Sequence, residues 1–215
     1  MPGLAKIAEA ARAQALDIAG LVAQGSAPMP ERVRTILLLA PDEPRFWPHF
    51  IQSPEYRDGA PDPMDRWSLR IVGALAKELG AQPLFPFATQ PPHPFYTWAL
   101  ASGRVWSSPV QFLVGARSGL WASYRGALGF ADALNPLPKV AKPCDSCAQP
   151  CATACPVGAL TPAGYNTDAC HAYLDTKAGQ DCMTNGCAVR RACPVSTAFG
   201  RDPAQSAFHM RHFHR

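Results

Sequence analysis

The sequence predicts an α+β protein in two parts. Branched apolar runs alternate with amphipathic segments in about the first two thirds of the chain, all eight cysteines lie after residue 143, and closely spaced prolines separate these regions. We therefore expect an N-terminal mixed α/β domain over residues 1–135, a linker over residues 136–143, and a cysteine-organised domain with a C-terminal tail over residues 144–215. The 215 residues are enough for two modest domains with cores of their own.

Three elements are expected at the start of the N-terminal domain. Apolar residues recur along one face over residues 4–22, which predicts an amphipathic helix. The run RTILLLA, residues 34–40, is short, apolar and branched, and is typical of a buried strand. Residues 41–50 indicate the start of a second helix, with Asp42 as its cap and prolines confined near its first turns.

The clearest helix signal covers residues 62–80. Asp62 is placed as the N-cap, and Pro63 occupies the first helical position, where its missing N–H costs nothing. Gly80 follows the last amphipathic turn, where a left-handed residue commonly ends a helix. Both ends of this helix can therefore be predicted from local residues.

The remainder of the N-terminal domain is expected to contain an edge strand, a helix and a hairpin. The proline-bearing run PLFPFA, residues 83–88, suits the edge of a sheet. A helix is expected over residues 94–103, ending at a glycine. Residues 110–128 predict a hairpin of two apolar strands around the turn ARSG, residues 116–119.

Composition and charge limit the kinds of partner and the cellular compartment that we expect for this protein. No stretch approaches the ~18 apolar residues of a membrane span, so none is expected. The first twenty residues lack a basic head followed by an apolar block, so we expect no export signal and a cytoplasmic protein, whose cysteines would not pair as disulfides. Lys and Arg nearly balance Asp and Glu after residue 143, so no nucleic acid is expected as a partner. Arg190 and Arg191 fit a solvated face.

The cysteines form two groups that each end in Cys-Pro-Val. The first group reads Cys-x2-Cys-x3-Cys-x3-Cys-Pro, and the second has one isolated cysteine followed by Cys-x4-Cys-x5-Cys-Pro. This layout is typical of a bacterial two-cluster ferredoxin, in which the last cysteine of each run ligates the other cluster. Thiolates are soft ligands that suit iron–sulfide cubes, so we expect two [4Fe–4S] clusters. The expected ligand set 1 is Cys144, Cys147, Cys151 and Cys193, and the expected ligand set 2 is Cys155, Cys170, Cys182 and Cys187.

Two structural zinc sites of four cysteines each are the alternative metal assignment. Zinc modules usually pair two close cysteines with two distant ones. Four closely spaced cysteines that end in Cys-Pro fit that pattern poorly. A structural zinc protein without a redox role therefore stays the weaker alternative.

Three segments of the C-terminal region resemble the cluster domain of epoxyqueuosine reductase and its cobalamin-dependent relatives. They are CDSCAQPCATACPVGAL, ACHAYLD and DCMTNGCAVRRACPVS, and in that family too the fifth cysteine stands alone before an aromatic–Leu pair, here Cys170 with Tyr173 and Leu174. The stretch WALASGRVWSSPVQFLVGARSGLWASYRGAL is more faintly similar to the segment that precedes the clusters in that family. The resemblance covers roughly residues 60–200. It implies an N-terminal cobalamin-reductase scaffold and clusters that reduce the corrinoid.

The chain departs from that family in two places. The family's catalytic aspartate lies in a segment that reads LFPFATQPPHPF here, with no carboxylate between Glu78 and Asp132, so His93 or Tyr96 would have to donate the proton. Because the chain stops at Arg215, we also expect the family's helical-repeat extension to be missing. These departures favour an electron-transfer protein, either a carrier with a redox partner protein or the relay of a small reductase. A cobalamin-dependent reductase is the alternative.

Overall fold

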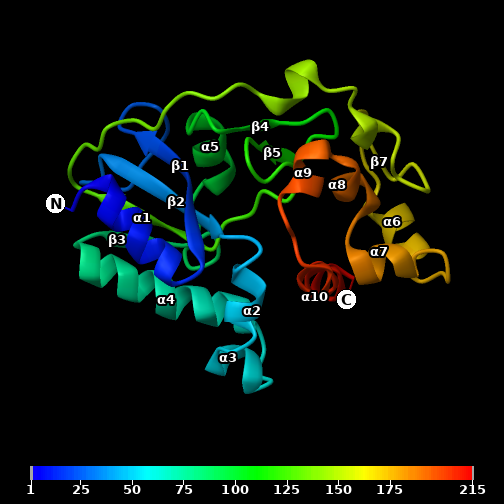
Figure 1. Ribbon diagram of the computed structural model, residues 1–215, viewed down its shortest axis with the longest axis horizontal. Coiled ribbons are helices and arrows are strands. Elements are labelled where there is room, and N and C mark those ends of the chain that lie inside the picture. Colours follow the sequence, from blue (N-terminus) through cyan, green and yellow to red (C-terminus); the bar gives the residue numbers. More distant parts are fainter. Residues whose placement is uncertain (1, 215) are drawn as a thin grey trace. The chain divides into compact units, whose positions relative to one another are not determined.

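The computed structural model describes residues 2–214 and is an α+β structure with antiparallel sheets and a cysteine-rich C-terminal region (Figure 1). Its chain forms two compact units. Unit 1 consists of Met1–Val105 and Ser123–Val140, and unit 2 of Trp106–Ala122 and Ala141–Arg215. The chain passes from unit 1 to unit 2 for the last time within the proline-spaced segment 136–143. Residues 106–122 belong to unit 2, which holds the cysteines, although they precede that segment.

Unit 1 is built on a four-stranded antiparallel sheet. The strand order is β1-β2-β6-β3, so the sequentially distant β6 lies between β2 and β3. Leu37 of β2 pairs with Leu21 of β1 on one side and with Leu128 of β6 on the other. The predicted buried strand over residues 34–40 and the predicted edge strand are both confirmed, the latter in shortened form. The strands are β1 (Leu16–Ala23), β2 (Thr35–Pro41), β3 (Gln82–Leu84) and β6 (Gly126–Phe130).

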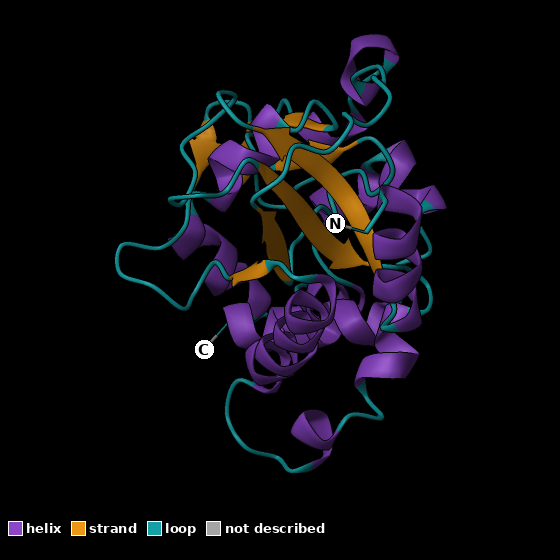
Figure 2. Ribbon diagram, turned by 90° about the vertical axis from the view of Figure 1, so that its left-hand side faces the viewer, coloured by secondary structure: helices purple, strands orange, loops and turns teal. Residues whose placement is uncertain are grey.

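Helices pack against this sheet and close its core (Figure 2). The predicted helix over residues 62–80 is confirmed as α4, which Asp62 precedes and Gly80 ends at a φ of 68°. Trp67 of α4 is fully buried. The helix predicted over residues 94–103 is also present. The helices of this unit are α1 (Leu4–Ala13), α2 (Phe46–Phe50), α3 (Pro54–Arg57), α4 (Pro63–Leu79) and α5 (Phe95–Ala101).

The predicted helix over residues 4–22 is wrong in its second half. Helix α1 ends at Ala13, Ala15 adopts a left-handed φ of 53°, and the chain then enters β1. The sequence LDIAGLVA pairs along its length with β2. The small and branched residues of this segment fit the periodicity of a helix or of a strand. Its pairing with β2 therefore decides that it forms a strand.

The expected cap at Asp42 is also wrong. Helix α2 begins at Phe46, and its N-cap position is Arg45, without a side-chain cap. The Asp42 carbonyl accepts the backbone N–H groups of Arg45 and Phe46, and its carboxylate accepts a bond from the Arg45 guanidinium at 3.1 Å. Asp42 thus organises the turn before the helix.

The expected hairpin over residues 110–128 is wrong as a single unit. Its turn exists, because Gly115 and Gly119 exchange two backbone hydrogen bonds of 2.9 and 3.0 Å. The strand before it, β5 (Leu113–Gly115), pairs with β4 (Val105–Ser107). The strand after it is β6, which belongs to the sheet of unit 1. The two apolar runs therefore find different partners.

Unit 2 consists mainly of short helices and turns that carry the cysteines. Helix α10 packs on α7. No helix within residues 2–214 is long and apolar enough to cross a membrane. The elements after the linker are η1 (Pro143–Ser146), η2 (Pro150–Ala152), β7 (Leu160–Thr161), β8 (Gly164–Tyr165), α6 (Thr167–Leu174), α7 (Gln180–Asn185), α8 (Ala188–Ala192), α9 (Pro194–Ala198) and α10 (Pro203–Phe213).

Candidate metal centre

A cavity of about 350 Å³ in unit 2 is lined by all four cysteines of ligand set 1. Cys144 lies on η1 and Cys151 on η2, with Cys147 in the turn between them. Cys193 comes from the junction of α8 and α9 and completes the set from far along the chain. Pro194 follows it as the first residue of α9, where a proline starts a helix without wasting a donor.

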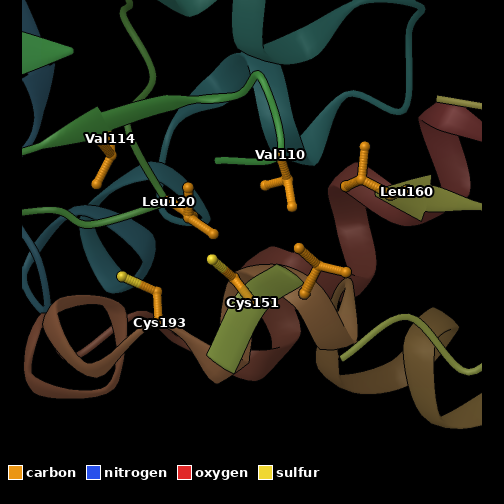
Figure 3. Close-up of a cluster of buried hydrophobic side chains, with 7 residues drawn as sticks. Val110, Val114, Leu120, Cys151, Leu160 and Cys193 are labelled. Atoms are coloured by element: carbon orange, nitrogen blue, oxygen red, sulfur yellow. The ribbon is translucent and has the colours of Figure 1, made fainter. Parts of the chain in front are cut away.

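The opposite wall of the cavity is apolar. Val114 and Leu120 line it, and both belong to a buried cluster that includes Cys151 and Cys193. Figure 3 shows the thiols of Cys151 and Cys193 pointing toward this wall. The backbone N–H of Leu120 donates to the Ser196 hydroxyl at 2.8 Å, which fixes the wall to α9, the helix that begins just after Cys193. The wall therefore limits the access of water to the buried Cys151 and Cys193.

This environment disfavours isolated thiolates. Burial raises the pKa of the Cys144 thiol, and negative charge on Cys193 and Cys147 raises it further, although Lys142 acts in the opposite direction. Burial likewise raises the pKa of Cys151, together with the charges of Cys193 and Cys144. A bound metal group reverses this balance, because its positive charge favours the deprotonated ligand.

Charges on the cysteines of ligand set 2 raise the pKa values of nearby thiol and phenol groups. Burial raises the pKa of Cys182, and negative charge on Cys187 raises it further. The Tyr165 side chain is hydrogen-bonded to Cys170; burial, that bond and the charges of Cys170 and Cys187 raise the Tyr165 pKa. Burial raises the pKa of Tyr173, and so do charges on Cys182 and Cys155. Cys170 lies on α6, Cys182 on α7, Cys187 at the N-cap of α8, and Cys155 directly before Pro156.

Cysteines of both sets accept hydrogen bonds from the backbone. The N–H of Gln149 donates to the Cys147 sulfur at 3.3 Å, and the N–H of Ala159 donates to the Cys155 sulfur at 3.2 Å. Hydrogen bonds to sulfur are among the features by which proteins set the potentials of iron–sulfur clusters. The turns after these cysteines thus already present donors to the ligand atoms.

The dimensions of the first site suit a group of several atoms. A single zinc ion requires all of its thiolates within about 2.3 Å of one point. Here the four cysteines of set 1 line a cavity of about 350 Å³. Within residues 2–214, no three His, Cys, Asp or Glu side chains converge as a single ion would require. All eight cysteines are free thiols.

The two candidate proton donors lie in unit 1. The His93 ring stacks on Trp98 with a centroid separation of 5.5 Å and an interplanar angle of 29°. The Trp98 indole N–H donates to the Pro28 carbonyl at 2.6 Å, so this aromatic pair is anchored to the loop before β2. Tyr96, on the first turn of α5, is 50% exposed.

Sequence reasoning missed the apolar wall and misjudged one arginine. Val114 and Leu120 were expected in a hairpin of the N-terminal domain, and their apolar character alone carries no signal for a metal site. Arg190 is partly exposed, but its guanidinium is held in place: it lies 4.4 Å from the centroid of the Phe112 ring and donates to the Leu120 carbonyl. Arg191 does lie near the surface, where it pairs with Asp181.

Comparison of the chain with protein-family models, with curated protein sequences and with solved structures finds no match. What the structure itself defines is an α+β protein with a cysteine-rich C-terminal region, in which four of the eight cysteines line one cavity.

Proposed function

We propose that this protein is an iron–sulfur electron-transfer protein that holds two [4Fe–4S] clusters, as a carrier or as the internal relay of a reductase. The observation that carries the proposal is the position of Cys193, which lines one cavity with Cys144, Cys147 and Cys151. A shared site for these four thiols is what the crossed ligation of a two-cluster ferredoxin requires.

We also propose a specific fold for each of the two regions of the chain. The C-terminal region would be a two-cluster ferredoxin-like domain, and the N-terminal region would keep a scaffold similar to that of cobalamin-dependent reductases. The first statement is supported by the cysteine spacing and by the way the thiols gather. The second is supported by the segments that resemble the epoxyqueuosine reductase family.

Different residues of unit 2 have different roles in the proposed electron-transfer site. When bound, the clusters supply one-electron oxidation and reduction. The eight thiolates hold them, and the wall of Val114 and Leu120 limits water at the first site. The N–H groups of Gln149 and Ala159 stabilise negative charge on their sulfur acceptors.

Metal analysis tests the proposal directly. Protein that is expressed and purified without oxygen should be brown and should contain about eight iron and about eight sulfide per chain. A matched variant, Cys151→Ala, should retain about half of both, because only the first site loses a ligand. A colourless, folded protein with stoichiometric zinc would overturn the proposal and support the structural zinc alternative.

A titration with cob(II)alamin separates an electron carrier from a corrinoid-dependent reductase. With no carboxylate between Glu78 and Asp132, and with His93 stacked on Trp98, unit 1 offers a poor proton donor for corrinoid chemistry. We expect unit 1 to serve as a docking surface for a redox partner or to keep a vestigial pocket, and the absorption spectrum of the corrinoid to stay base-on. A base-on to base-off change at micromolar protein would instead favour the reductase.

A further inference from the structure

Ser108 is a buried serine at the cavity that the four cysteines of ligand set 1 line. It comes directly after β4, lines the same cavity and is only 7% exposed. Val110, which follows in the same segment, belongs to the buried cluster that contains Cys151 and Cys193 (Figure 3). The segment after β4 therefore packs against the side of unit 2 that carries these sulfur atoms.

The Ser108 hydroxyl is buried and makes no hydrogen bond with any group of residues 2–214. The backbone of Ser108, in contrast, is satisfied: its N–H donates to the Phe112 carbonyl at 2.9 Å, and its carbonyl accepts the Gln111 N–H at 3.0 Å. These two bonds hold Ser108 in a turn beside the cavity. A buried hydroxyl without a partner is unfavourable, so such a group commonly marks the position of a ligand or of an ordered water.

The lining of the cavity favours sulfur as the acceptor for this hydroxyl. Val114 and Leu120 contribute apolar side chains to the lining, and these accept no hydrogen bond. The backbone carbonyl of Leu120 already accepts the Arg190 guanidinium. The four thiols of ligand set 1 belong to the same lining, and a bound cluster supplies negatively charged sulfur, which is a good acceptor for a hydroxyl donor.

We propose that the Ser108 hydroxyl donates a hydrogen bond to a sulfur atom of the cluster of ligand set 1 and thereby raises the reduction potential of that cluster. This inference rests on the proposed function. In the experiment below, dithionite supplies one electron to the cluster and is oxidised to sulfite, while the hydroxyl proton stays on Ser108. The hydrogen bond is stronger to the more negative, reduced cluster, so it favours reduction.

Potentiometric titration followed by electron paramagnetic resonance measures the midpoint potentials of both clusters. Cys144→Ser identifies the signal of ligand set 1, because it alters a ligand of that set alone. Ser108→Ala should lower the potential of this cluster by about a tenfold change in the equilibrium constant for reduction, or about 59 mV, and leave the other unchanged. Ser107→Ala is the matched control: Ser107 is exposed at the end of β4, so both potentials should keep their wild-type values.

Two variants of equal shape separate the hydrogen bond from packing. Ser108→Thr keeps the hydroxyl, whereas Ser108→Val places a methyl group where threonine has its hydroxyl. The potential of the cluster of ligand set 1 should therefore be higher in Ser108→Thr than in Ser108→Val. This comparison decides the matter even if Ser108→Ala fails to fold.

Resonance Raman spectra in H₂O and D₂O give a second readout that a purely structural role would not change. Exchange of a donated proton for deuterium shifts the Fe–S stretching bands of the sulfur that accepts it. The shift should be smaller in Ser108→Ala than in the wild type, because one exchangeable donor is lost.

Equal potentials in Ser108→Thr and Ser108→Val would assign any effect of Ser108→Ala to packing and overturn this inference. A Ser108→Ala potential equal to that of the wild type would mean that water satisfies the hydroxyl, and would also overturn it. Both results would leave the two clusters, and so the proposed function, in place. Wild-type protein without clusters would overturn the proposed function and this inference with it.

Discussion

Gly119 lies so close to Cys193 that a β-carbon on Gly119 would come within 3.0 Å of the Cys193 sulfur. The same β-carbon would stand 2.4 Å from the backbone nitrogen of Ser196. Gly119 also has a φ of 55°, a left-handed conformation that favours glycine. The turn after β5 can therefore reach the sulfur ligand only because this residue has no side chain.

Gly119→Ala should selectively empty the site of ligand set 1. The added methyl group displaces α9 and Cys193 from the cavity, so the iron content should fall from about eight to about four per chain. Gly103→Ala is the matched control, because Gly103 has a φ of 65° but a β-carbon there would meet nothing within 4 Å. Both variants carry the left-handed strain of roughly 1–2 kcal/mol. Equal iron contents in the two variants would show that the close approach to Cys193 is unimportant.

Cys193→Ala should damage a cluster whose other ligands lie far away in sequence. Cys193 lines the cavity of Cys144 and Cys151. In electron paramagnetic resonance spectra of the reduced protein, its loss should therefore alter the same cluster signal as Cys144→Ser, a variant that removes another cysteine of ligand set 1. Cys187→Ala, which removes a cysteine only a few residues away from Cys193, should alter the other signal. If Cys193→Ala and Cys187→Ala perturb the same cluster, the crossed ligation is wrong.

Trp67→Ala should strongly destabilise unit 1. The Trp67 ring is fully buried and meets Phe46 edge-to-face at a centroid distance of 5.3 Å. Removing a buried aromatic side chain of this kind costs about 3–5 kcal/mol in the free energy of unfolding. Leu69→Ala, on the same helix but 45% exposed, should cost less than about 1 kcal/mol. Urea unfolding followed by circular dichroism measures both, and similar losses would contradict the assigned core.

The ion pair between Asp58 and Arg66 should make the start of α4 sensitive to acid. Arg66 donates to both carboxylate oxygens at 2.7 and 2.8 Å and, with the Ala60 N–H, lowers the pKa of Asp58 to about 2. Because the folded pKa lies below the unfolded value of about 3.9, the stabilisation is present above about pH 4 and is lost as the pH falls toward 2.

Asp58→Asn tests this dependence by amide hydrogen exchange in the first turn of α4. At about pH 5 the variant should exchange faster than the wild type, and at about pH 2 the two should exchange alike. The comparison at each pH cancels the intrinsic pH dependence of exchange. A difference between variant and wild type that persists at about pH 2 would mean that Asp58 acts through something other than its charge.

The sequence predicts best where the signal is local. The α4 helix could be placed from Pro63 and Gly80, because breakers act within one turn, whereas Asp62 stands at the N-cap position in a left-handed conformation and its side chain makes no cap hydrogen bond. The grouping of Cys193 with the first run of cysteines could also be predicted, since the two Cys-Pro endings imply a crossing.

Long-range pairing explains most of what the sequence could not supply. β1 had a helix-compatible pattern, and only its pairing with β2 makes it a strand. The two arms of the ARSG turn look alike in composition, yet β5 pairs with β4 while β6 lies between β2 and β3. The contacts of Arg190 are with Phe112 and Leu120, which are about seventy residues away, so no local pattern distinguishes it from Arg191.

The interrupted path of the chain through unit 2 affects how the site is assembled during synthesis. Residues 106–122 leave the ribosome well before Cys144, and Cys193 emerges last of the eight cysteines. Until then the apolar side chains of Val114 and Leu120 have no partners on α9. A gene fragment that starts at the first cysteine would encode every thiol but would lack the apolar wall of the cavity. The cysteine-rich region therefore cannot be moved to another protein as one continuous segment.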